Sequence, residues 1–157
     1  MDVTVRPASP ADREAIAALL TESWGAPVAV AHGVRYDTAD LPALIAERDG
    51  RIAGLLTYTI GPDGLEVVTL DAVVRRAGVG GALLAAAAEL APGRLWLVTT
   101  NDNLDALRFY QRRGMRIVGV GVGAVDASRA VKPSIPLVGA YGIELHDELI
   151  LELRPPR

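Results

Sequence analysis

The stretch that decides the fold of this 157-residue chain is residues 75–115, RRAGVGGALLAAAAELAPGRLWLVTTNDNLDALRFYQRRGM. Its glycines precede an alanine- and leucine-rich segment, 79–90, whose apolar residues share one helical face. Residues 95–100 form a continuous apolar run, typical of a strand covered on both faces. A second helix is predicted from Asn103 to near Gly114. This order predicts a glycine turn, a helix, a strand and another helix.

Upstream of the glycines, the sequence predicts three consecutive antiparallel strands over 44–48, 52–60 and 65–74. The Asp49-Gly50 pair between the first two accepts the positive φ angles of a two-residue turn. The segment 28–42 is interrupted by glycine and proline, so we expect a loop or a short helical turn there.

The two ends of the chain complete the expected element order. Ser9 is a candidate N-cap, with Pro10 at the first helical position. Downstream, strands are expected over 115–125 and 148–153, with mostly irregular chain over 127–147. These elements predict a single domain, 1–157, of α/β (α+β) class, with a mixed, mostly antiparallel sheet flanked by helices.

Composition excludes several function classes. Lys and Arg number 16 against 19 Asp and Glu, a net charge of −3 that opposes binding to nucleic acid. With no cysteine and two histidines, we expect no disulfide and no metal site. The sequence has no apolar run that could span a bilayer and no secretion signal, so we expect a cytoplasmic protein without a membrane partner.

The glycine turn is a candidate anion site. Gly78, Gly80 and Gly81 lie where a strand leads into a helix, and the first amides of a helix point outward without internal acceptors. Phosphate binds at such a terminus, and Arg75 and Arg76 can supply counter-charge. A tight turn without a ligand explains the same residues about as well.

The segment downstream favours the anion site through a resemblance. Arg75-x-x-Gly78-x-Gly80 resembles the R/Q-x-x-G-x-G/A signature of the GNAT acetyltransferases, and Asn103-x-x-Ala106 followed by Phe109-Tyr110 resembles their second motif. Arg76 and Met115 depart from the family pattern, where a glycine and a phenylalanine are common.

The resemblance implies an N-acetyltransferase that moves acetyl from acetyl-CoA to a primary amine of a small molecule or peptide by direct transfer. Asn103 would hydrogen-bond the pantetheine arm and Tyr110 would protonate the departing thiolate. The expected acetyl-CoA contacts are Ala72, Val73, Val74, Arg75, Arg76, Ala77, Gly78, Val79, Gly80, Gly81, Ala82, Asn103, Ala106 and Tyr110. An oxyanion contact would come from a backbone amide over 70–73. The alternative is a non-catalytic acetyl-CoA sensor or partner-binding module.

The base that deprotonates the amine stays open between Glu66, Asp71 and water. Glu66 resembles the catalytic glutamate of some family members, although a solvated carboxylate beside a turn explains it equally well. Trp24, His32 and Tyr36 are candidates for acceptor specificity.

Three further features stay open. The run 146–148 is interpreted as a solvated turn before a strand in preference to a metal or acid/base cluster, and the proline-containing segment 132–136 could cover the substrate. Strand edges near 119–125 or 148–153 could pair in a homodimer.

Overall fold

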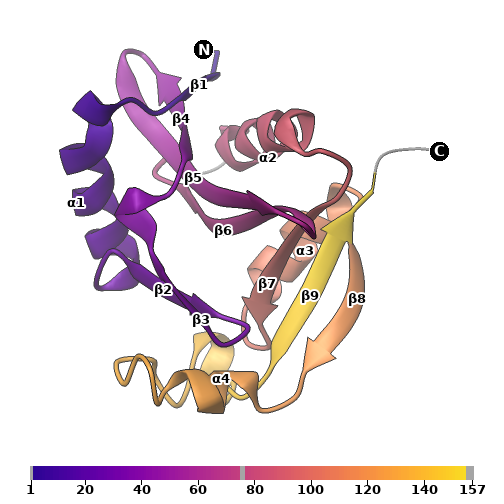
Figure 1. Cartoon of the computed structure of the whole chain (residues 1–157). Helices are drawn as coiled ribbons and strands as arrows, with labels where there is room; N and C mark the ends of the chain where they lie inside the picture. The colour runs from indigo at the N-terminus through magenta and orange to yellow at the C-terminus, as the bar shows by residue number, and fades with distance from the viewer. Residues whose placement is uncertain (1, 75–76, 155–157) are drawn as a thin grey trace. The chain divides into compact units, whose positions relative to one another are not determined.

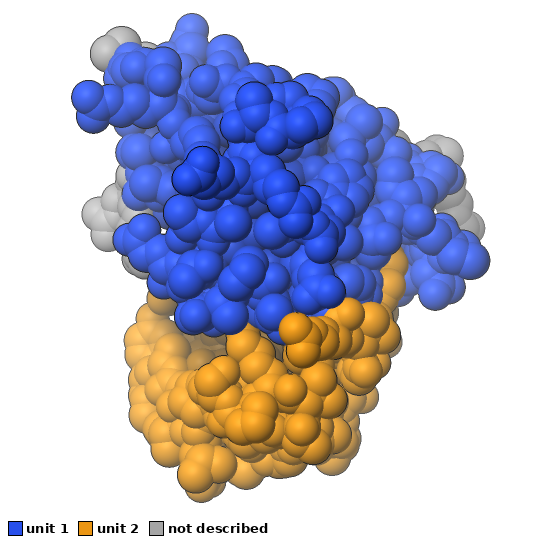
Figure 2. All heavy atoms as spheres, turned by 60° about the vertical axis from the view of Figure 1, so that its left-hand side comes forward, with its two compact units in different colours: residues 1–29, 36–95 blue, residues 30–35, 96–157 orange. Residues whose placement is uncertain are grey.

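The computed structural model describes residues 2–74 and 77–154, with the element order shown in Figure 1. The chain forms two compact units, coloured separately in Figure 2. Unit 1 takes its residues from 1–29 and 36–95, and unit 2 from 30–35 and 96–157. The single domain expected from sequence stays a prediction.

Unit 1 contains four strands in the spatial order β1-β4-β5-β6, with every adjacent pair antiparallel. Asp49 and Gly50 adopt φ values of 54° and 74° in the turn between β4 and β5, which confirms the predicted hairpin. The third strand ends at residue 72, two residues earlier than expected. The four strands are β1 (Thr4–Pro7), β4 (Ala43–Arg48), β5 (Arg51–Gly61) and β6 (Gly64–Ala72).

Two helices pack on opposite faces of these strands. Helix α1 (Arg13–Trp24) follows a 3₁₀ turn, Pro10–Asp12, with Ser9 as its N-cap residue as expected. Its Ile16 and Leu20 join Leu55 of β5 in one buried cluster. The preceding residue, Gly54, faces the other side, where α2 (Val79–Leu90) packs. Figure 1 shows α1 and α2 on the two sides of β4 and β5.

The prediction of a loop or short helical turn over 28–42 is correct for Thr38–Asp40 but misses two strands before it. The segment contains a two-stranded sheet of β2 (Val28–Ala31) and β3 (Val34–Asp37), followed by a 3₁₀ turn at Thr38–Asp40. His32 and Gly33 have φ values of 42° and 78°, and a tight two-residue turn requires positive values at both. The usual pairs in such turns are Asn-Gly, Asp-Gly and Gly-Gly. A His-Gly pair is not among them, so the sequence did not predict this hairpin.

Unit 2 contains three strands in the order β7-β9-β8, of which β8 and β9 are antiparallel. The helix α3 (Leu104–Arg112) begins after Asn103, and β9 matches the expected range. The segment 127–147 is largely irregular, with a 3₁₀ turn at Ala140–Gly142. The strands are β7 (Leu95–Thr100), β8 (Arg116–Gly121) and β9 (Glu148–Leu153).

The expected strand over 115–125 is too long. After β8, Gly123 adopts a φ of 72° and begins the short helix α4 (Ala124–Ser128). The Gly123 amide donates to the Asp147 carboxylate at 2.8 Å, which stabilises this turn. Gly119 of β8 packs closely on its partner strand, since a Cβ there would lie 3.2 Å from Ile150 Cδ1.

Strand β8 lies at the edge of its sheet and exposes Ile117, Val118 and Val120. A homodimer formed through this edge stays a prediction. Among the described residues, no helix is both long enough and apolar enough to cross a membrane.

Close packing at Gly54 holds the start of α2. A methyl group built on Gly54 would overlap Val79 Cγ1 and lie 2.9 Å from the Asp71 carbonyl oxygen, whereas one on Gly61, in the same strand, meets nothing within 4 Å. We therefore expect Gly54→Ala to lower the free energy of unfolding by about 1–3 kcal/mol through overpacking. Gly61→Ala is the matched control and should change it by less than about 0.5 kcal/mol. Urea denaturation measures both; equal effects would contradict the close approach.

Candidate active site

The candidate anion site begins where β6 ends at Ala72. The amides of Val73 and Val74 both donate to the Ala53 carbonyl, at 2.7 and 3.2 Å. The Val73 amide, one of the expected oxyanion donors, is thereby engaged within the protein. Arg75 and Arg76, two of the predicted acetyl-CoA contacts, lie outside the described residues.

The glycine turn opens helix α2 as predicted. Gly78 is the N-cap residue with a φ of 76°, and a Cβ there would meet nothing within 4 Å, so its surroundings are open. Its carbonyl accepts from the Ala82 amide at 3.0 Å, the first bond of the helix. The amides of residues 79–81 precede this bond, and the first amides of a helix have no acceptor within it. This geometry suits a phosphate group, which the helix dipole also favours.

A one-residue bulge in β6 determines where its acidic side chains point. The register passes from Thr57↔Thr69 to Tyr58↔Val67, so Val68 has no counterpart on β5. An extra residue reverses the alternation of side chains along the bulged strand. The bulge thereby places Glu66 and Asp71 on the same face, because their partners Thr59 and Leu55 both lie on the α1 face of the regular strand β5.

Glu66 is buried on this face, with 3% of its surface exposed. The interpretation as a solvated carboxylate is therefore wrong. The Tyr36 hydroxyl, from β3, donates to Glu66 Oε1 at 2.6 Å. Burial, and then the hydrogen bond to Glu66, raise the pKa of Tyr36 well above its usual value, so the phenol keeps its proton at neutral pH.

Asp71, the second candidate base, binds the end of α1. Trp24 Nε1 donates to its two carboxylate oxygens, at 2.9 and 3.2 Å. Burial raises the pKa of Asp71, and hydrogen bonds from Trp24 and Ser23 oppose that shift. Between the two acids, the buried hydroxyls of Thr57 and Thr69 lie 2.6 Å apart and hydrogen-bond each other.

The second predicted motif lies on α3 in unit 2. Asn103 caps this helix: its Oδ1 accepts from the Ala106 amide at 3.3 Å, and its Nδ2 donates to Thr99 Oγ1 at 3.3 Å. Tyr110 is half-buried, with its ring edge-on to Phe109 at a centroid distance of 5.3 Å. Asn103, Ala106 and Tyr110 share one face of the helix by their spacing.

The predicted site residues therefore fall into two groups. Glu66, Asp71 and the described residues of the glycine turn belong to unit 1, while Asn103, Ala106 and Tyr110 belong to unit 2.

The acidic run at 146–148 is not a single solvated turn. His146 is exposed and its Nδ1 lies 3.0 Å from Asp126 Oδ2, while Glu148 is buried and accepts from the His32 amide at 3.1 Å. Asp126, as the nearest partner, raises the pKa of His146. Among the described residues, no group of three acidic or histidine side chains is arranged to hold a metal ion.

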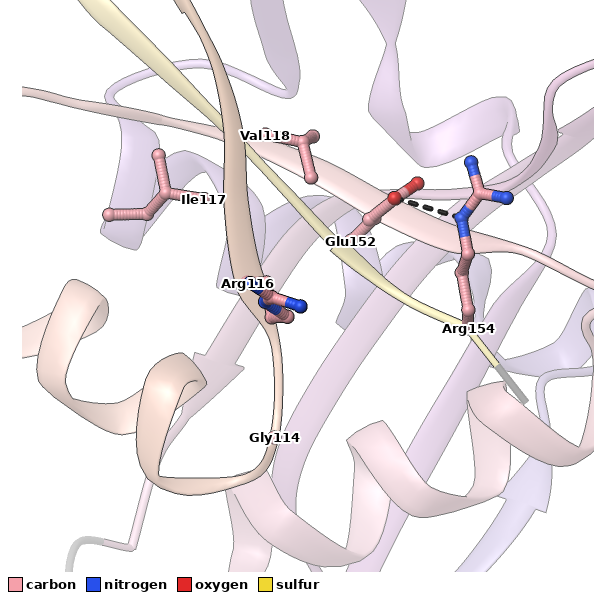
Figure 3. Close-up of a pocket in the computed structure, with 6 residues that line it drawn as sticks. All are labelled: Gly114, Arg116, Ile117, Val118, Glu152 and Arg154. Carbon is pink, nitrogen blue, oxygen red and sulfur yellow. Dashed lines mark hydrogen bonds and ion pairs between the residues drawn. The ribbon is translucent and has the colours of Figure 1, made fainter. Parts of the chain in front are cut away.

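A pocket of about 440 Å³ lies on β8 and β9 (Figure 3). Arg154 Nε and Glu152 Oε1 form an ion pair of 2.9 Å at its wall. The lining consists of Gly114, Arg116, Ile117, Val118, Glu152 and Arg154, and includes none of the predicted catalytic or acetyl-CoA contacts.

Comparisons with known proteins agree with these local features. The Acetyltransferase (GNAT) family pattern matches residues 13–115. The protein YxbD of Bacillus subtilis (strain 168) is 36% identical over 154 residues, covering 95% of this chain and 97% of that protein. An IAA acetyltransferase from Bacillus cereus ATCC 14579 has a similar structure, with a TM-score of 0.74 at 19% identity, covering 98% of this chain and all of that one.

A GNAT family acetyltransferase from Elizabethkingia anophelis, solved with acetyl-CoA bound, is also similar, with a TM-score of 0.67 at 19% identity over 98% of each chain. The chain therefore belongs to the GNAT acetyltransferase family, within the acyl-CoA N-acyltransferase class. This confirms the predicted fold class: α/β (α+β), with a mostly antiparallel sheet flanked by helices.

Two variants of Asn103 test its capping role. Asn103→Ala removes the acceptor for the Ala106 amide, and we expect it to lower the free energy of unfolding by about 1 kcal/mol. Asn103→Asp keeps a side-chain oxygen and adds a negative charge at the helix N-terminus, so its stability should stay close to wild type. Chemical denaturation measures both, and an equal loss in the two variants would contradict capping.

Proposed function

We propose that the protein transfers acetyl from acetyl-CoA to a primary amine of a small molecule or peptide, within a ternary complex. Tyr110 acts as general acid and Glu66 as general base. The observation that carries the proposal is the buried Glu66 carboxylate, which the bulge turns to the α1 face of the strand leading into the glycine turn. Family membership supports the same reaction class.

We assign acetyl-CoA binding to two motifs, the glycine turn at the start of α2 and the Asn103-x-x-Ala106 motif at the start of α3. The outward amides at the start of α2 suit the pyrophosphate, with residues 72–74 and 77–82 lining that end and Arg75 and Arg76 supplying positive charge. Asn103 and Ala106 would contact the pantetheine arm. The Elizabethkingia anophelis acetyltransferase with bound acetyl-CoA supports this choice of co-substrate.

The proton transfers follow from the chemistry of the two groups. Glu66 takes a proton from the acceptor ammonium, and because it is buried it does so through an intervening water. The neutral amine forms the nitrogen–carbon bond, and the carbon–sulfur bond breaks. Tyr110 gives its proton to the thiolate and regains one from the new amide nitrogen through solvent. The products are the acetylated amine, CoA thiol and one released proton.

Direct transfer is favoured over a covalent acetyl-enzyme. The chain has no cysteine to form a thioester. A phenol such as that of Tyr110 also suits the role of general acid in direct transfer. An unperturbed phenol has a pKa of about 10 and is a weaker acid than a thiol, so it stays protonated until the thiolate forms. Asp71 is the less suitable base, since both of its oxygens accept from Trp24.

Acetyl-CoA binding is tested by calorimetric titration of wild type and two Gly80 variants. Gly80→Glu places a carboxylate at the start of α2 and should weaken binding at least tenfold, because it repels the phosphates where the helix favours an anion. The neutral Gly80→Gln is similar in size and should lose less. Absence of binding by the wild type would contradict the proposal.

Turnover is tested by thiol release with a panel of primary amines: putrescine, tryptamine, glucosamine and an alanyl peptide. Tyr110→Phe should keep its affinity for acetyl-CoA and lose kcat by about 10²-fold or more, as general acid catalysis typically contributes 10²–10⁴-fold. Unchanged kcat would remove Tyr110 from the mechanism. Tight acetyl-CoA binding without turnover of any amine would favour the sensor alternative.

A further inference from the structure

Glu66 is a buried carboxylate that accepts a hydrogen bond from the Tyr36 hydroxyl. Glu66 is 3% exposed, and its Oε1 accepts from the Tyr36 hydroxyl at 2.6 Å, a short bond typical of an ionised acceptor. Buried carboxylates are rare unless they have partners, because removing the charge from water is costly. The Tyr36 hydroxyl therefore supplies a hydrogen-bond partner to a carboxyl group that has little access to water.

Tyr36 is held in place by its own hairpin. It lies in β3, and the Thr38 amide two residues further on donates to the Pro27 carbonyl at 3.0 Å, closing the root of the β2–β3 hairpin. Thr38 is 1% exposed, so this closure is buried. The backbone on the C-terminal side of Tyr36 is thereby anchored to Pro27, and the phenol reaches Glu66 from this anchored strand.

The bulge restrains the other partner. Without the extra residue Val68, Glu66 would point to the α2 face and could not meet a side chain on the α1 face. One phenol hydrogen bond does not saturate a carboxylate, which offers about four lone-pair sites. The Tyr36 hydroxyl engages one oxygen of Glu66, Oε1, and so restrains the direction of the carboxylate.

We propose that Tyr36 is a positioning residue for Glu66: its hydroxyl holds the carboxylate in the orientation from which Glu66 accepts the proton of the acceptor amine. Tyr36 does not itself exchange a proton with the substrate. This inference rests on the proposed function, because it assigns Tyr36 a role only through Glu66 as base.

A double-mutant cycle on the full chain tests the inference. Tyr36→Phe removes only the hydroxyl, and we expect kcat for the best amine of the panel to fall about ten- to a hundredfold, because a hydrogen bond to a charged group is lost. The KM for the amine and the affinity for acetyl-CoA should stay within about twofold, since binding contacts are unchanged. Tyr58→Phe is the matched control, as Tyr58 lies in β5 on the opposite face and should retain wild-type kcat.

The cycle separates positioning from structural damage. In a Glu66→Gln background, Tyr36→Phe should have no further effect on kcat, because the two residues act as one unit. A structural role would lower kcat equally in both backgrounds and would overturn the inference. Calorimetric stoichiometry with acetyl-CoA gives the active fraction of each variant.

An optical readout tests the contact without any acceptor. The absorbance difference between wild type and Tyr36→Phe during an alkaline titration isolates the ionisation of Tyr36, one of four tyrosines. In the Glu66→Gln background this ionisation should move to lower pH, because the neutral amide no longer opposes the phenolate. No movement would overturn the contact itself.

The outcomes distinguish the two levels of the proposal. Turnover that is unaffected by Glu66→Gln contradicts Glu66 as base, and absence of turnover contradicts the proposed function. Turnover that requires Glu66 but is insensitive to Tyr36→Phe leaves the proposed function intact and overturns the inference alone.

Discussion

The one-residue bulge at Val68 is the constraint on which the chemistry of unit 1 depends. In a regular strand, Glu66 and Asp71 would point to opposite faces, because they are an odd number of positions apart and side chains alternate between faces. The extra residue brings both to the α1 face, together with the paired hydroxyls of Thr57 and Thr69. A local irregularity in one strand thus assembles a polar row on a face that begins as the hydrophobic core beneath α1.

The two faces of β5 and β6 carry different kinds of contact. On one face, Gly54 admits Val79 at close range, which places the start of α2 and its outward amides at the end of β6. On the other face, the acids meet aromatic donors: Asp71 binds Trp24, and Glu66 binds Tyr36. The start of α2, whose amides suit an anion, and the two carboxylates therefore lie on opposite faces of the same two strands.

Much of the fold was predictable because its signals are local. The Asp49-Gly50 turn, the alanine-rich α2, the capped α3 and the alternating β9 each follow from the residues within the element. The β2–β3 hairpin was missed because its turn is His32-Gly33, which is not one of the Asn-Gly, Asp-Gly or Gly-Gly pairs that signal a two-residue turn. The early end of β8 was missed because the Gly123 turn depends on Asp147, 24 residues away.

The family, the two motifs and most of the elements could be inferred from the sequence, since glycine spacing, capping and helical periodicity depend on neighbouring residues. The sequence could not decide whether Glu66 was solvated or buried. Only the tertiary structure decided that, because the side chain's direction follows from the strand register across the bulge and its partner, Tyr36, lies 30 residues away. Burial and orientation are properties of packing between distant segments, whereas the motif is a property of the chain.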